Sequence, residues 1–276
     1  MNVRFESRRD AIPAAEFMEL KTLIDRKLGP MVQAYALTWA RPYRVSCMSI
    51  TAAFAFGMDV SYCASGCKAT ERSPYFNSPT RRPYDDLHIR PAMSLAALDF
   101  EKAKALIDRG TGADGTAPQG TAYLVVSGDA ARDVRAAEYR LLDPAASRGI
   151  KIELVEGGPV HDRADVLFYF VGAAAVSRIT SNRFLPGAIA DHLTSYGGRL
   201  TDSRQMSAVR WLEAGATGSY GTTSEPCNIL GKFPYIPVLV SHYLAGETLI
   251  EAYWKSVAMP GQGLFIGEPL AAPFRR

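Results

Sequence analysis

The chain has 276 residues, of which 47% are hydrophobic and 21% are charged. This composition is typical of a globular protein and excludes a disordered, collagen-like or disulfide-dense chain. A formal net charge of +3 is too small to indicate a nucleic-acid or acidic-membrane partner. We interpret residues 1–276 as a single α/β domain, because no Pro-rich or Gly/Ser-rich linker divides the sequence.

Predicted helices alternate with short apolar strands along the chain. Helical spacing and capping residues predict helices at residues 14–28, 99–110, 129–142, 203–214 and 247–258. Apolar runs predict strands at residues 34–39, 120–126, 152–155, 166–171, 187–193, 216–220 and 264–267. Periodicity is lost over residues 41–90, which we expect to form an irregular excursion. The alternation predicts a three-layer sandwich with a mainly parallel central sheet, on which ligands gather at the carboxyl ends of strands.

Neither a targeting segment nor a membrane span is predicted. Residues 1–10 are charged from the outset and contain no apolar stretch for a secretory signal. The longest apolar run, residues 166–176, has 11 residues, fewer than the roughly 20 that a spanning helix needs.

Four cysteines are too few for a disulfide framework in a chain of this length. Cys63 and Cys67 leave three interpretations open: a local disulfide, free thiols, or zinc ligands, the last without the other ligands that zinc requires. Cys227 is a nucleophile only if a base or a positive environment lowers its pKa, and the sequence supplies neither. A buried or disulfide-bonded Cys227 is therefore preferred.

A dense polar cluster follows the predicted strand at residues 187–193. Asp191, His192, Thr194 and Ser195 include the residue types of an orienting acid, a base and a nucleophile. Neighbouring residues on a strand point to opposite faces, however, which speaks against Asp191 acting on His192. In the alternative interpretation, Asp191 and Thr194 cap local backbone groups and the glycines at 197–198 form a turn.

A second polar segment follows the predicted strand at residues 216–220. Thr222, Thr223, Ser224 and Glu225 should lie at its carboxyl end, where Glu225 could receive a cationic group of a ligand. Alternatively, the three hydroxyls satisfy backbone groups of the loop and Glu225 caps a turn.

Motifs for cofactors and metals are not found. The sequence has no Walker loop, no His-Glu-x-x-His and no Gly-x-Ser-x-Gly elbow. The glycine-rich residues 215–221 follow a predicted helix, whereas a dinucleotide site needs a strand before the glycines. We therefore predict no cofactor and no metal. Five arginines in the excursion form either a basic rim suited to carboxylates or phosphates, or a solvated loop: Arg41, Arg44, Arg72, Arg81 and Arg82.

Several stretches together resemble a bacterial protein family that has no assigned function. They are residues 41–51, 73–78, 186–195, 211–221, 225–227, 246–255 and 267–270. More distantly, the order of the predicted helices and strands resembles that of the caspase–haemoglobinase fold of gingipain-type cysteine peptidases. It rests on residues 84–90, 215–221 and 246–255 with 267–269, and it implies a caspase-type topology.

This second resemblance also implies where a catalytic dyad belongs. The peptidases carry a His-Gly pair just after the strand at residues 166–171, where this chain has Gly172 and Ala173. Their nucleophilic cysteine ends the next strand, where this chain has Thr194 and Ser195. Both halves of the dyad are missing, and the loop of the specificity pocket falls on residues 222–225.

The leading expectation is therefore a catalytically degenerate, peptidase-like domain. It binds a peptide or other polar ligand in the inherited cleft, through Gly172, Ala173 and residues 222–225. The first alternative is a hydrolase that uses Asp191 and His192 with Ser195 or Thr194. The second is a scaffold component without a small ligand.

The N-terminus differs from that of the resembling family. Its members begin with an additional strand and helix, often behind a secretion signal, and the resemblance implies that this chain starts after both. We leave the localisation open, with export expected if the sequence is incomplete. A lost strand would also expose an edge of the sheet.

Overall fold

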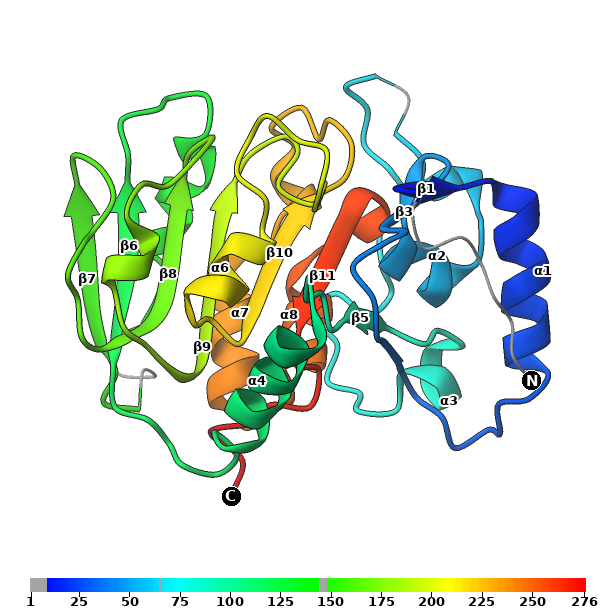
Figure 1. Ribbon diagram of the computed structural model, residues 1–276, viewed down its shortest axis with the longest axis horizontal. Coiled ribbons are helices and arrows are strands. Elements are labelled where there is room, and N and C mark those ends of the chain that lie inside the picture. Colours follow the sequence, from blue (N-terminus) through cyan, green and yellow to red (C-terminus); the bar gives the residue numbers. More distant parts are fainter. Residues whose placement is uncertain (1–8, 65, 144–147) are drawn as a thin grey trace.

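The computed structural model describes residues 9–64, 66–143 and 148–276. Residues 1–8, for which the sequence predicts no secretory signal, lie outside this part of the chain. A large mixed sheet forms the centre of the molecule (Figure 1). Its strands lie in the order β2 (Tyr35–Leu37), β5 (Ala92–Ser94), β11 (Gly263–Gly267), β10 (Gly218–Thr222), β9 (Phe184–Leu193), β8 (Val166–Gly172), β6 (Thr121–Val126) and β7 (Lys151–Glu156).

The neighbouring strands of this sheet are parallel except for β10 and β11, which pair antiparallel. Every residue of β8 is buried, as expected of a central strand covered on both faces. The predicted α/β fold with a mainly parallel central sheet is therefore confirmed.

Helices cover both faces of the sheet. The described helices are α1 (Ala14–Asp25), α2 (Ile50–Phe56), α3 (Pro83–Leu87), α4 (Phe100–Thr111), α5 (Ala136–Tyr139), α6 (Val209–Ala214), α7 (Ile236–Leu244) and α8 (Leu249–Ser256). Figure 1 shows α4 and α6 in front of the sheet and α7 and α8 behind it. None of the described helices has the length and apolar character needed to cross a lipid bilayer.

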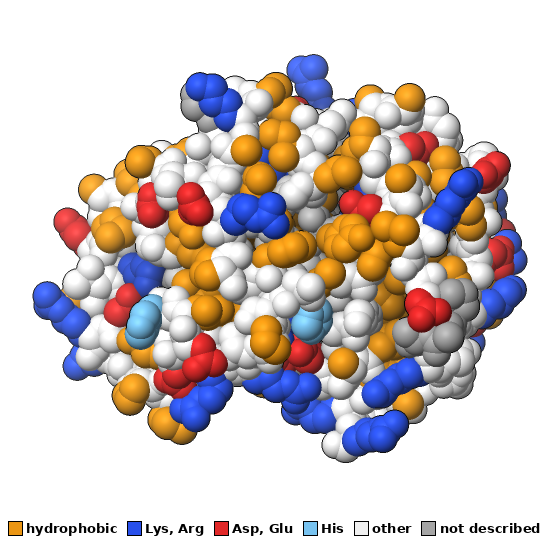
Figure 2. All heavy atoms as spheres, turned by 180° about the vertical axis from the view of Figure 1, so that it is seen from behind, with side chains coloured by type: hydrophobic (Ala, Val, Ile, Leu, Met, Phe, Trp, Pro, Cys, Tyr) orange, Lys and Arg blue, Asp and Glu red, His pale blue; other side chains and the backbone are white. Residues whose placement is uncertain are grey.

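Adjacent residues of β8 point to opposite faces of the sheet and contact the two helical layers. Phe168 contacts Tyr243 of α7 edge to face, with ring centroids 6.3 Å apart. Tyr169 contacts Trp211 of α6 on the opposite face, with centroids 5.0 Å apart. The period of two along a strand thus gives each face its own apolar core. Seen from behind in Figure 2, apolar side chains form a band across the face that α7 and α8 cover.

The excursion contains more regular structure than the sequence predicts. Residues 41–90 include α2, α3 and two short strands, β3 (Arg44–Val45) and β4 (Met48–Ser49). These strands form a small separate sheet with β1 (Ala11–Ile12). The excursion is tied to itself by the Cys47–Cys63 disulfide and to the rest of the chain by Cys67–Cys227.

The predicted helix at residues 129–142 is mostly absent. The chain forms a short 3-10 turn at Asp133–Arg135 followed by the four-residue α5. Asp133 accepts hydrogen bonds from the backbone N–H groups of Ser127 and Gly128, at 3.1 and 2.7 Å, and so ties this segment to the end of β6. Arg135 is drawn inward to a buried carboxylate. Tertiary contacts therefore override the helical pattern.

Candidate functional site

A cavity of about 340 Å³ lies at the carboxyl ends of β9 and β10. These strands point to the upper edge of the sheet in Figure 1. The walls of the cavity come from four parts of the chain: the loop after β6, the end of β9, the loop after β10 and the excursion. The lining residues are Cys67, Ala131, Arg132, Leu193, Thr194, Ser195, Glu225, Cys227 and Asn228.

Two glycines bring the wall segments together. A Cβ atom on Gly221 would lie 2.3 Å from the backbone nitrogen of Gly198, and one on Gly198 would lie 2.4 Å from the carbonyl oxygen of Gly221. Only residues without a side chain permit this approach. The hydroxyl of Thr222 then donates to the carbonyl oxygens of Thr194 and Ser195, at 3.1 and 2.9 Å. The loop after β9 is thereby fixed to β10.

The floor of the cavity carries a hydroxyl and a guanidinium group. Thr194 is buried, donates to Gln205 Oε1 at 2.9 Å, and accepts from Arg132 Nε at 3.2 Å. Arg132 also forms an ion pair with Asp129 at 2.6 Å, so most of its charge is balanced. Ser195 is half-buried, and its hydroxyl has no hydrogen-bond partner among the residues that the structure describes.

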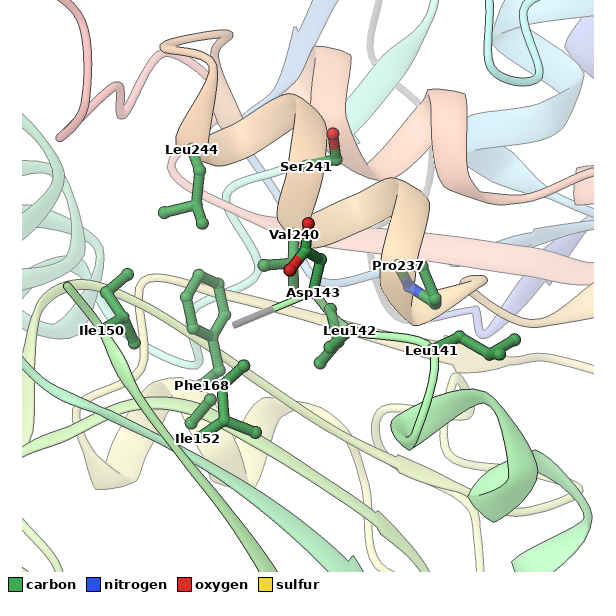
Figure 3. Close-up of a pocket in the computed structure, with 11 residues that line it drawn as sticks. Leu141, Leu142, Asp143, Ile150, Ile152, Phe168, Pro237, Val240, Ser241 and Leu244 are labelled. Carbon is green, nitrogen blue, oxygen red and sulfur yellow. The ribbon is translucent and has the colours of Figure 1, made fainter. Parts of the chain in front are cut away.

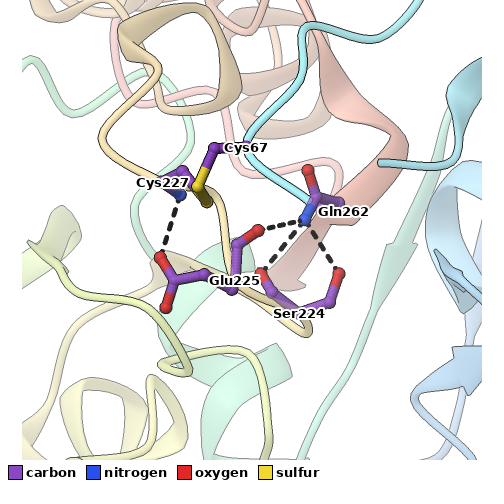
Figure 4. The surroundings of a disulfide bond; sticks show 5 residues. All are labelled: Cys67, Ser224, Glu225, Cys227 and Gln262. Atoms are coloured by element: carbon purple, nitrogen blue, oxygen red, sulfur yellow. Dashed lines mark hydrogen bonds between the residues drawn. A yellow bond between two sulfur atoms is a disulfide. The ribbon is translucent and has the colours of Figure 1, made fainter. Parts of the chain in front are cut away.

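The opposite wall is held by a disulfide and a glutamine (Figure 4). Gln262 Nε2 donates to the carbonyl oxygens of Ser224 and Glu225, at 3.3 and 2.8 Å, and to the Ser224 hydroxyl at 2.9 Å. Glu225 Oε1 accepts from the backbone N–H of Cys227 at 2.9 Å. Glu225 is exposed, lines the cavity and forms no ion pair with any described residue, although its charge interacts with that of Lys232 at longer range.

Asp191 and His192 are not part of this cavity, and they serve opposite faces of the sheet. Asp191 forms a buried ion pair with Arg135 on the face that α5 and α7 cover. Trp211 Nε1 donates to His192 Nδ1 at 2.9 Å on the other face, and His192 Nε2 donates to the carbonyl oxygen of Met206 at 2.9 Å.

The environment of each side chain sets its pKa. Burial raises the pKa of the Asp191 carboxyl, and Arg135 lowers it in part. Burial also lowers the pKa of His192 to about 4, and the two hydrogen bonds occupy both ring nitrogens of the neutral imidazole. The expected arrangement of Asp191 as orienter and His192 as base beside Ser195 or Thr194 is therefore not formed.

The other predicted ligand-binding residues lie close to the cavity but do not line it. A Cβ atom on Gly172 would lie 2.2 Å from the carbonyl oxygen of Arg132, so backbone fills the space beside it. Ala173 packs in an apolar cluster instead. The hydroxyls of Thr222 and Thr223 donate to carbonyl oxygens of other segments, at residues 194–195 and 262, and the hydroxyl of Ser224 accepts from the Gln262 side chain. The prediction that these hydroxyls satisfy backbone groups of their own loop is therefore wrong, and Glu225 alone of this segment lines the cavity.

Sequence reasoning missed two important parts of the site. Arg132 follows the end of β6, and the same rule that selected the ends of the other strands applies there too. Cys67 could not be paired from the sequence, because its partner Cys227 is 160 positions away. The local Cys63–Cys67 disulfide is corrected to Cys47–Cys63 and Cys67–Cys227, which leaves no free cysteine among the described residues.

A second cavity, of about 250 Å³, lies between the β6–β8 part of the sheet and α7 (Figure 3). Leu142, Ile152, Phe168 and Val240 are among its walls, so its lining is mostly apolar. Within the described part of the chain, no three His, Cys, Asp or Glu side chains are grouped so that they could hold a metal ion.

Comparisons of the chain with protein families, with curated proteins and with solved structures find no match.

Proposed function

We propose that the chain is a catalytically degenerate, peptidase-like domain that binds a peptide or other polar ligand in the 340 Å³ cavity. One observation carries the proposal. The cavity brings Arg132, Thr194, Ser195 and Glu225 to the ends of parallel strands, whereas both of its sulfur atoms are joined in a disulfide. A gingipain-like ancestry with caspase-type topology is part of this proposal, and the adjacent strands β8 and β9 support it because they carry the two positions of the dyad.

The charges at the cavity favour a ligand with a cationic group. Asp129 balances Arg132, whereas Glu225 forms no ion pair with a described residue and interacts with the charge of Lys232 only at longer range. The unpaired carboxylate therefore attracts a lysine-like or arginine-like group. The free hydroxyl of Ser195 supplies a hydrogen bond to the backbone of a peptide.

Binding of short peptides to the oxidised protein, measured by isothermal titration calorimetry, tests the proposal. We expect peptides that contain Lys or Arg to bind, and Glu225→Gln to weaken them about tenfold, the equivalent of about 1.4 kcal/mol. Asp162→Asn is the matched control, because Asp162 is 66% exposed and lies outside the cavity lining. Equal affinity in both variants would contradict the role of Glu225.

Cleavage of the same peptides separates binding from catalysis. We expect none, because the imidazole of His192 is occupied by Trp211 and Met206. Cleavage that is lost in Ser195→Ala or Thr194→Ala would contradict the proposal and support the hydrolase alternative. No observation on the described residues favours that alternative.

A further inference from the structure

A further cavity, of about 250 Å³, shares no lining residue with the candidate site. Ala34 and Pro91 directly precede β2 and β5, and Thr248 caps α8, so the cavity lies at the amino-terminal ends of the two parallel strands. Its lining residues are Gln33, Ala34, Tyr75, Arg81, Pro83, Pro91, Thr248, Ile250, Glu251, Leu270 and Arg275.

The charges that line this cavity are predominantly positive. Neither Arg81 nor Arg275 has a side-chain hydrogen bond or ion pair with a residue that the structure describes. Glu251 is the one acidic residue of the lining, and its Oε2 accepts from the N–H and hydroxyl of Thr248, at 2.8 and 2.6 Å. With two arginines and one glutamate, the lining carries a net charge of +1.

Tyr75, another lining residue, carries a buried hydroxyl. Tyr75 is fully buried, and its hydroxyl has no hydrogen-bond partner among the described residues. A buried donor without a partner is unfavourable, which makes it a feature that needs explanation. Burial raises the pKa of Tyr75, with nearby Glu251 adding to the effect, so that the hydroxyl keeps its proton.

The remaining walls are apolar. Ala34, Pro83, Pro91 and Ile250 line the cavity, and Leu270 at its rim is 65% exposed. Burying such surface against an apolar ligand gains about 25 cal/mol for each Å² removed from water. A purely ionic ligand would leave these walls in contact with water.

We propose that this cavity binds a small monocarboxylate with an apolar body, whose carboxylate lies between Arg81 and Arg275 and whose apolar part contacts Ile250 and Leu270. The planar guanidinium group donates two parallel hydrogen bonds to a carboxylate. A single negative charge matches the net charge of the lining, whereas a phosphate dianion exceeds it. The excursion thus contributes a basic residue, Arg81, to a binding site that is separate from the candidate peptide site.

The experiment compares 3-phenylpropanoate with its neutral amide by isothermal titration calorimetry on the full chain. We expect the acid to bind with a Kd at or below about 1 mM and the amide to bind at least about tenfold more weakly. Acetate should also bind at least about tenfold more weakly than 3-phenylpropanoate, because it leaves the apolar walls exposed.

Variants then assign the binding to this cavity. Arg81→Gln and Arg275→Gln should each weaken the acid about tenfold, whereas Arg82→Gln should not. Arg82 is the matched control, because it is the next residue, is exposed, and pairs with Asp85 outside the lining. All three arginines are at the surface, so that folding is preserved and circular dichroism can verify it.

Three results would overturn the proposal. They are no binding of 3-phenylpropanoate at millimolar concentration, equal affinity for the acid and the amide, and equal weakening by Arg81→Gln and Arg82→Gln. The test is independent of the peptide-binding cavity, because no lining residue is shared by the two sites.

Discussion

Two adjacent residues of β9, Asp191 and His192, act as structural residues of different helical layers. Asp191 neutralises Arg135 inside the sandwich, and removing one partner of such a buried pair leaves the other charge uncompensated. His192 links Trp211 of α6 to the segment at Met206 through both of its ring nitrogens. Their polar chemistry is therefore used for folding, which explains why a chemically attractive sequence cluster lacks the geometry of a catalytic site.

We predict that His192 makes the protein less stable in mild acid. Its pKa is about 4 in the folded protein, because burial disfavours the charged ring, against 6.5 when unperturbed. Between these values the unfolded chain binds a proton that the folded chain does not, so stability is lost as the pH falls. The loss attributable to His192 between pH 7 and pH 4 is about 3 kcal/mol. Urea denaturation across this range measures it.

The control for this effect is His192→Gln, which keeps a donor and an acceptor but does not titrate. We expect its stability to fall less steeply below pH 6.5 than that of the unaltered protein. Titration of the His192 ring by NMR gives its pKa directly, and a value near 6.5 would contradict the prediction even if the variant does not fold.

At the scale of elements, the candidate site depends on how closely the loop after β9 approaches β10. Gly198 and Gly221 form this contact, and Thr222 adds two hydrogen bonds to the carbonyl oxygens of Thr194 and Ser195. The site is therefore built from backbone contacts as much as from the polar side chains that line it.

We predict that Gly221→Ala is destabilising and weakens peptide binding. The added methyl group lies against the backbone of Gly198, and the displacement of the loop should cost about 1–3 kcal/mol. The control is Gly29→Ala, since no atom lies within 4 Å of a Cβ atom there, and its stability should change by no more than about 0.5 kcal/mol. Urea denaturation compares the two, and equal midpoints would contradict the proposed contact.

At the scale of the whole molecule, the two disulfides fix the excursion over the sheet. Cys47–Cys63 closes a short loop with a sequence separation of 16, whereas Cys67–Cys227 joins positions 160 apart. A cross-link restricts the unfolded chain more strongly when it closes a longer loop. The second disulfide also forms a wall of the candidate site.

We predict that the long-range disulfide contributes more stability than the local one. Chain entropy gives about 5 kcal/mol for Cys67–Cys227 and about 3 kcal/mol for Cys47–Cys63. The double variants Cys67→Ala/Cys227→Ala and Cys47→Ala/Cys63→Ala measure the two contributions by urea denaturation. The variant Cys67→Ala/Cys227→Ala should also weaken peptide binding, because it frees the segment that carries Glu225. A larger loss in the second pair would contradict this order.

Local patterns were sufficient for much of the fold. The apolar run at β8 correctly predicted a strand buried on both faces, and Asp99 caps α4 by accepting from Lys102 N–H at 2.8 Å. Gly215 ends α6 with a φ of +117°. These features depend on residues that are neighbours in the chain, so helix and strand propensity and hydrophobic periodicity are sufficient to predict them. In contrast, α7 was missed, because its residues are apolar around much of the helix and give no clear period.

By itself the sequence determined the α/β class, the mainly parallel sheet and the strand ends at which polar residues gather. Only the tertiary structure decided that His192 faces Trp211, that Asp191 faces Arg135, and that Cys67 reaches Cys227. The physical reason is that periodicity tells which residues share a face of a strand but not what covers that face. Partners distant in the sequence are chosen by packing, and that packing separated the chemically suggestive cluster from the cavity beside it.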